Sequence, residues 1–258
     1  MKRNRRRLLH DLARKSLTAA ATIAVLAGGA VPAHTMEPVT DAAPVVIELY
    51  TSQGCSSCPP ADAYLGELAQ RRDVLALAFH VDYWNYIGWA DPFSSPEATA
   101  RQRAYARFLN ERAIYTPQMV VDGAAHEVGS NRAAVAAAIK AAALQPKTSL
   151  LLVNDDSGGY RIVIGEAEDA DASPDEPAIV WLVEYDQTHV TSVKRGENTG
   201  KTLTEYNIVR AFRPIGEWDG SATEIALPPA ETDAEACAVI VQADPVGPVY
   251  AAAAFALE

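Results

Sequence analysis

Cys55 and Cys58 stand at a spacing that can support redox chemistry. They are separated by two serines and followed by two prolines, in the stretch YTSQGCSSCPPAD (50–62). Such a pair can close a structural disulfide, supply half of a zinc site, or exchange electrons with another thiol pair. In the third case one thiol attacks a disulfide and the other resolves the mixed disulfide. The predicted secondary structure around the pair is needed to choose among these three roles.

The flanking sequence predicts a strand before the cysteine pair and a helix after it. VVIELY (45–50) is a short apolar, β-branched run, typical of a buried strand, and Pro59 opens a predicted helix. A helix start offers unpaired N–H groups and the positive end of the dipole, which lower the pKa of a nearby thiol. We therefore expect Cys55 to be the exposed nucleophile and Cys58 the resolving thiol.

The rest of the chain divides near Pro146. Before it, strand and helix signals alternate; after it, strand-like runs such as AIVWLVEYD and CAVIVQAD recur with little helical periodicity. The sequence predicts a flexible lead over 34–43, an α/β domain over 44–146 and a β-rich, sandwich-like domain over 147–258.

Several motifs resemble those of a known family. ELYTSQGCSSCPPAD, HVDYWNYIGW, DPFSSP, YTPQMVVDG and RGEN are similar to signature stretches of an exported bacterial family, domain of unknown function 1223, which is assigned a thioredoxin-like fold. In the thioredoxin superfamily a cis-proline faces the CxxC pair. The resemblance implies that Pro117 is this proline, that the backbone of Thr116 pairs with a substrate, and that the protein is a thiol–disulfide oxidoreductase.

Glu48, His80 and Cys237 are further candidates. The resemblance implies a buried acid in the first strand, so Glu48 either assists proton transfer to the resolving thiol or points to solvent at a strand edge. His80 ends the second predicted strand, where α/β sheets build their sites. Cys237 lies in an apolar run and is expected to be a buried core thiol. RGENTGKTL (195–203) is either a loop that reaches the thiols or a plain turn.

Two other functions stay open alongside the oxidoreductase. One is a metal chaperone, with copper as the expected metal, that binds through Cys55, Cys58 and His80. The other is a non-catalytic binding module in which the disulfide only clips the helix start. For the oxidoreductase we expect no cofactor, because the Cys55–Cys58 pair carries the electrons itself, and two protein partners: a thiol or disulfide client and a redox partner.

The first 33 residues have the pattern of a secretory signal. A basic segment is followed by an uncharged apolar run and by Val31 and Ala33 at the spacing of a signal-peptidase site. We therefore expect a protein that is periplasmic or secreted, with no stable membrane insertion after cleavage. Without the signal the chain carries 15 basic and 32 acidic residues, a net charge of −17. Such a charge disfavours nucleic acid and anionic membrane surfaces as partners.

Overall fold

The computed structural model describes residues 43–154, 159–168 and 173–256, so the predicted signal over 1–33 lies outside the described residues. The helices of the described chain are α1 (Pro59–Leu68), the short 3-10 helix η1 (Asn85–Ile87), α2 (Pro96–Phe108) and α3 (Arg132–Ala142). The strands are β1 (Val45–Thr51), β2 (Val74–His80), β3 (Gln118–Val121), β4 (Ala125–Val128), β5 (Leu150–Asn154), β6 (Tyr160–Ile164), β7 (Ala178–Ser192), β8 (Thr202–Trp218), β9 (Thr223–Ala226), β10 (Ala236–Gln242) and β11 (Val249–Ala256).

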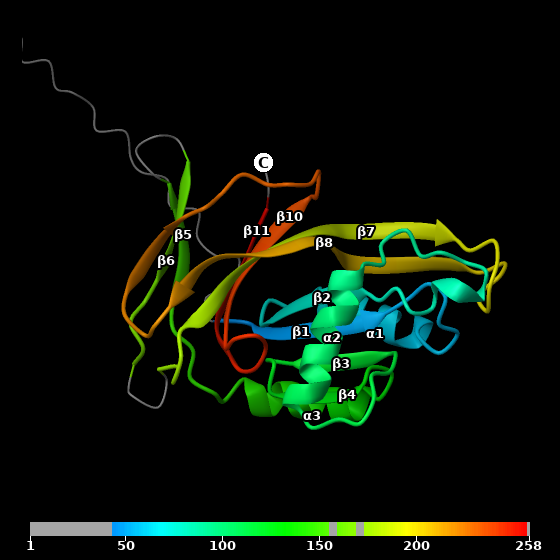
Figure 1. Ribbon diagram of the computed structural model, residues 1–258, viewed down its shortest axis with the longest axis horizontal. Helices are drawn as coiled ribbons and strands as arrows, with labels where there is room; N and C mark the ends of the chain where they lie inside the picture. Colours follow the sequence, from blue (N-terminus) through cyan, green and yellow to red (C-terminus); the bar gives the residue numbers. More distant parts are fainter. Residues whose placement is uncertain (1–42, 155–158, 169–172, 257–258) are drawn as a thin grey trace, which may run out of the picture. The chain divides into compact units, whose positions relative to one another are not determined.

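Most strands join one mixed sheet. Its order is β11-β10-β7-β8-β2-β1-β3-β4. β1 and β2 run parallel and are connected through α1, whereas β3 pairs antiparallel with β1 on its other side. This arrangement makes β1, from which the CxxC loop departs, an interior strand between β2 and β3 (Figure 1).

Helices cover both faces of this sheet. Side chains alternate along a strand, so Ile47 and Leu49 of β1 pack with α1 and α3, while Val46 and Tyr50 pack with α2 on the opposite face. Figure 1 shows α2 in front of the strands, on the viewer's side. By the same alternation Glu48 belongs to the α2 face.

The sheet continues across the predicted boundary between residues 146 and 147. β7 and β8 form a long antiparallel hairpin, and β8 joins β2 through the single parallel bridge Ala78–Ile208. The described residues cluster as one compact unit. The two predicted domains therefore share one sheet, and strands of the second half can contribute to a site in the first.

A smaller sheet packs on the distal part of the large one. It has the order β5-β6-β9, and its Leu152 and Ile162 share a buried cluster with Val180 of β7 and Val239 of β10. The prediction of an α/β first half and a β-rich second half is confirmed in these terms. In the described part of the chain, each helix is too short or too polar to cross a membrane.

Candidate functional site

Cys55 and Cys58 form a disulfide where β1 leads into α1. After Thr51 the chain turns, with the N–H of Cys55 donating to the carbonyl of Ser52, and Cys58 is the N-cap of α1. Pro59 takes the first helical position. A backbone N–H at this position makes no hydrogen bond within the helix, so its absence in proline costs nothing. The predicted pairing and the predicted order of strand, cysteine pair and helix are confirmed.

The disulfide is covered rather than exposed. Cys55 and its partner have no exposed surface, whereas the intervening Ser56 and Ser57 are exposed. The expectation that Cys55 is exposed is therefore wrong. One reason is close packing: a Cβ on Gly54 would lie 3.0 Å from the Cβ of Trp84, so this glycine lets the Trp84 loop lie against the cysteine loop.

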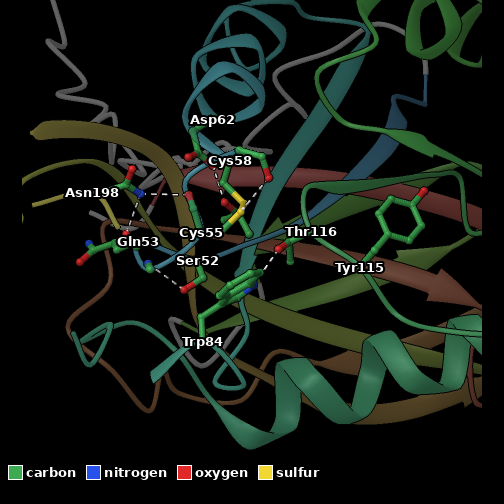
Figure 2. The surroundings of a disulfide bond; sticks show 12 residues. Ser52, Gln53, Cys55, Cys58, Asp62, Trp84, Tyr115, Thr116 and Asn198 are labelled. Carbon is green, nitrogen blue, oxygen red and sulfur yellow. Dashed lines mark hydrogen bonds between the residues drawn. A yellow bond between two sulfur atoms is a disulfide. The ribbon is translucent and has the colours of Figure 1, made fainter. Parts of the chain in front are cut away.

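A second cover comes from the loop between β7 and β8. The buried side-chain amide of Asn198 donates to the carbonyl oxygens of Gln53 and Cys55, at 2.9 Å each (Figure 2). The ammonium of Lys201 in turn donates to Oδ1 of Asn198. The RGENTGKTL stretch thus reaches across to the cysteine loop and is not a plain turn.

Gln53 ties the cysteine loop to the rest of the molecule. Its backbone N–H donates to Asp91, and its side-chain oxygen accepts from the indole of Trp89. Its side-chain nitrogen donates to Thr191 of β7 and to Glu205 of β8, at 2.9 and 2.7 Å. Strands from the second half of the chain therefore fix the residue that precedes the disulfide loop.

Thr116 and Pro117 lie beside the disulfide. Their peptide bond is cis, as the resemblance implies. Pro117 is buried, and the hydroxyl of the half-buried Thr116 accepts the indole N–H of Trp84 at 2.8 Å (Figure 2). Among the described residues, none forms a hydrogen bond with the backbone N–H or carbonyl of Thr116. This residue therefore has backbone groups free to pair with another chain.

Asp62 brings a buried carboxyl group to the site. It stands in the first turn of α1, four residues after Cys58, so both side chains lie on one face of the helix (Figure 2). Its carboxylate accepts a hydrogen bond from the hydroxyl of Thr51, with 2.7 Å between the two oxygens. Burial raises the pKa of Asp62 from 3.8 to about 7, although the Thr51 hydrogen bond and the charge of His80 oppose this. The group can give or take a proton near neutral pH.

The sequence analysis did not single out Asp62. An acidic residue in the first turn of a helix interacts favourably with the helix dipole, and this common role gives no reason to link it with the cysteines. The signal that could have identified it is its spacing of four from Cys58 in a helix that begins at the cysteine.

His80 is part of a buried polar cluster next to Asp62. Its Nδ1 lies 2.7 Å from Asp91, and its Nε2 lies 3.9 Å from Glu205. Burial alone would lower the pKa of His80, but the charges of Asp91, Glu205 and Asp62 raise it to about 9. Within the described ranges, no group of three or more His, Cys, Asp or Glu side chains is arranged to hold a metal ion. The structure thus does not combine His80 with Cys55 and its partner in a metal site.

Glu48 is neither near the resolving thiol nor at a solvent-exposed edge. It is buried and accepts two hydrogen bonds from Arg101, at 2.7 and 2.8 Å, and one each from Tyr50 and Tyr105. Burial alone would raise the pKa of Glu48, but the charge and hydrogen bonds of Arg101 hold it below its ordinary value. The structure corrects both interpretations, because Glu48 faces α2 while Asp62 lies on the α1 face.

Cys237 is a free, buried thiol in β10, as expected. Burial, with a smaller contribution from the charge of Glu184, raises the pKa of Cys237 to about 11. A thiol that keeps its proton at neutral pH is a poor nucleophile. Cys237 is therefore a core residue.

Comparison with known proteins identifies relatives of the chain. A family model described as "Protein of unknown function (DUF1223)" matches residues 46–242. The crystal structure of protein AGR_C_4864 from Agrobacterium tumefaciens is 30% identical, with a TM-score of 0.70 over 84% of this chain and 96% of that one. HBP35 of Porphyromonas gingivalis is 13% identical, with a TM-score of 0.55 over 83% of this chain and 75% of that one, a likeness of fold alone. A search of curated proteins gives no match.

Proposed function

Since the chain belongs to the DUF1223 family, whose members are described as proteins of unknown function, we propose a function from its site. The protein is a thiol–disulfide oxidoreductase that acts on the thiols or disulfides of a protein client. The observation that carries the proposal is the position of Asp62. A buried carboxyl group that titrates near pH 7 shares a helix face with Cys58 of the disulfide.

In this direction the reaction needs only the two cysteines and a proton donor. A client thiolate attacks the sulfur of Cys55, the Cys55–Cys58 bond breaks, and Cys58 leaves as a thiolate that takes a proton from Asp62. A second client thiolate then attacks the client sulfur bound to Cys55, the bond between them breaks, and Cys55 leaves as a thiolate that takes a proton from water. The client loses two electrons and becomes a disulfide, while the protein gains them as two thiols. The same steps run in reverse when the reduced protein meets a client disulfide.

The helix start assists the leaving thiolate. Cys58 caps α1, and the N–H groups of Ala61 and Asp62 bond to its carbonyl, so the positive end of the helix dipole lies at its sulfur. This stabilises the thiolate form of Cys58 as it leaves. A nearby acid that returns the proton then determines how fast the thiol forms.

The client binds as an extended segment along Thr116. In this respect we propose a thioredoxin-like site, supported by the resemblance of the motifs and by the unpaired backbone of Thr116 beside the disulfide. Because Cys55 has no exposed surface, and because the Trp84 loop and Asn198 pack on the cysteine loop, the client has to move one of these neighbours first.

We also propose that the protein acts outside the cytoplasm. The signal-like pattern of residues 1–33 and a disulfide between neighbouring cysteines support this. In an oxidising compartment the disulfide forms readily, and a separate redox protein returns it to its working state after each turnover.

Trapping of the mixed disulfide tests this function. Cys58→Ser leaves Cys55 without a resolving thiol, so it is expected to accumulate a mixed disulfide with envelope proteins or with a dithiol peptide. Cys55→Ser is the matched control and is expected to trap nothing. In the protein with both cysteines, Asp62→Asn is expected to slow the exchange with a dithiol peptide by roughly 100-fold, the usual loss for a general acid or base.

Other outcomes would identify a different role. If neither cysteine variant traps a client and the reduction potential of the disulfide lies below about −300 mV, the bond is a structural clip. Equal trapping by both cysteine variants would also contradict the assignment of Cys55 as the attacked sulfur.

A further inference from the structure

A cavity of about 370 Å³ lies at the end of α1 far from the disulfide. It is lined by the turn that follows α1, by the start of β2, and by parts of β7, β8 and β11. Because α1 has 10 residues, the cavity and the cysteines are about 15 Å apart along the helix axis. This site is therefore independent of the redox chemistry proposed above.

The cavity exists because β2 and β8 meet only once. Their single bridge is Ala78–Ile208, and towards the start of β2 the two strands diverge. The side chain of Asn207, whose backbone is in the left-handed region at φ 46°, donates to the carbonyl of Ala76 and closes the sheet there. Between this point and the start of β2, no described strand pairs with β2 on the side of β8. Side chains from both halves of the chain line the opening that remains there.

One wall depends on a close approach between a helix and a strand. The ring of Tyr206 lies directly on Gly66 of α1, since a Cβ at Gly66 would come within 2.3 Å of it. Tyr206 and the buried Phe255 of β11 give the cavity aromatic surface, and Leu75 adds aliphatic surface. Apolar walls of this kind suit the body of a small organic molecule.

The charge of the lining is opposite to that of the protein. The whole chain has a net charge of −11, yet none of the described residues that line the cavity is an aspartate or a glutamate. Arg71 and Arg72 both line it. Arg71 is held by Asp73 through two hydrogen bonds, at 3.0 and 2.7 Å, whereas Arg72 makes no ion pair within the described ranges. Arg72 is thus a cation without a protein counter-ion at the cavity.

A tyrosine hydroxyl opens onto the same cavity. Tyr185 of β7 lines the cavity, and only 6% of the residue is exposed. Its hydroxyl is not one of the enclosed polar atoms without a partner in the described part of the chain, so solvent reaches it from the cavity. A polar atom of a ligand in the cavity can take the place of that solvent. Beside the charge, this hydroxyl gives the cavity a second polar group.

We propose that this cavity binds a small organic anion with an aromatic or aliphatic body. Arg72 binds the anionic group, Tyr185 hydrogen-bonds a polar atom of the ligand, and the body packs against Tyr206 and Phe255. The size of the cavity, at the lower end of the range for ligand pockets, limits the ligand to a small molecule. The site selects against cations because Arg72 faces them, and against large ligands because β11 and the turn after α1 confine it.

Fluorescence titration with two related dyes tests the proposal. 8-Anilinonaphthalene-1-sulfonate carries a negative charge, and N-phenyl-1-naphthylamine has the same rings without it. We expect the sulfonate to bind with one site per chain. Arg72→Gln should weaken its binding roughly two- to fivefold, as for an exposed ion pair, and leave the uncharged dye unaffected. Tyr185→Phe should weaken it roughly two- to tenfold through one lost hydrogen bond.

Matched controls separate this site from other surfaces that attract the dye. Arg112→Gln removes an equally exposed cation outside the cavity and should leave the titration unchanged. Thr188→Trp puts a bulky side chain on the exposed rim of the cavity and should abolish binding. Identical titrations for Arg72→Gln and Arg112→Gln, or undiminished binding by Thr188→Trp, would overturn the proposal. Binding by the Cys55→Ser variant should equal that of the wild type, whatever the outcome of the redox experiments.

Discussion

Replacing Asp62 by asparagine should stabilise the protein at alkaline pH while it slows the proposed reaction. Asparagine has nearly the shape of aspartate and keeps an oxygen that can accept the hydroxyl of Thr51. The substitution therefore removes the charge but not the hydrogen bond. It isolates the free-energy cost of a buried carboxylate.

The size of this effect follows from the pKa of Asp62. Below its ordinary value of 3.8 the carboxyl group is protonated in the folded and unfolded chains, so it makes no difference to stability. As the pH rises towards about 7 the unfolded chain loses this proton while the folded chain keeps it, and stability falls. At about 1.4 kcal/mol for each pKa unit, the full loss above pH 7 is roughly 4 kcal/mol.

Urea denaturation of the oxidised protein at pH 4 and pH 8 measures this cost. Asp62→Asn should unfold at nearly the same urea concentration as the wild type at pH 4, and should be more stable by up to about 4 kcal/mol at pH 8. Glu217→Gln, at an exposed carboxylate of β8, is the control for a change of net charge alone. An equal effect of Asp62→Asn at both pH values, or a loss of stability at pH 8, would refute the reasoning.

Two further substitutions test the surroundings of the site. Glu48→Gln should destabilise the protein by roughly 3–5 kcal/mol in urea denaturation, since Arg101 is left as an unpaired buried charge. The same variant should keep the wild-type rate of thiol exchange, and a slower exchange would restore Glu48 to the reaction. Asn198→Ala should speed reduction of the disulfide by dithiothreitol roughly tenfold, because two hydrogen bonds no longer hold the cover closed. Glu197→Gln, an exposed neighbour, is the control; an unchanged rate for Asn198→Ala would show that the cover lies elsewhere.

The first half of the fold could be predicted because its sequence patterns are local. Buried strands at 45–50 and 74–83 have continuous apolar runs, and Pro59 marks the start of the first helix. The predicted ranges agree with β1, β2 and α1 to within a few residues. Hydrophobic runs and a helix-opening proline need no knowledge of distant residues.

The longest strand, β8, could not be recognised in the same way. It contains Pro214 and Gly216, which usually argue against a strand interior. The hairpin accommodates them with a register shift, in which Trp181 pairs with Pro214 and Val180 with Gly216. Beyond its one bridge with β2, no described strand pairs with the other side of β8, so the missing N–H of Pro214 is tolerated there. Only the tertiary arrangement shows that Pro214 and Gly216 can lie within a strand.

Spacing along the chain does not tell which carboxyl group lies on the same face of β1 as the helix that follows the cysteines, because neighbouring residues of a strand point to opposite faces. Glu48 precedes Cys55 by seven positions, and an even position in β1 faces α2. Thr51, at an odd position, faces α1 and there meets Asp62. A shift of one residue moves a side chain to the opposite face of a sheet, so spacing along the chain alone did not determine which carboxyl group lies near the disulfide.

The β7–β8 hairpin changes how the disulfide should be understood. The cysteine loop by itself would leave Cys55 open to any thiol, yet the hairpin holds the carbonyl of Cys55 through Asn198 and the side chain of Gln53 through Thr191 and Glu205. Access to the sulfur then depends on contacts made by residues more than 130 positions later in the sequence. In the proposed reaction, a client therefore has to displace the hairpin or the Trp84 loop before it can reach the sulfur. Selectivity for the client would accordingly arise from the second half of the chain, and chemistry from the first.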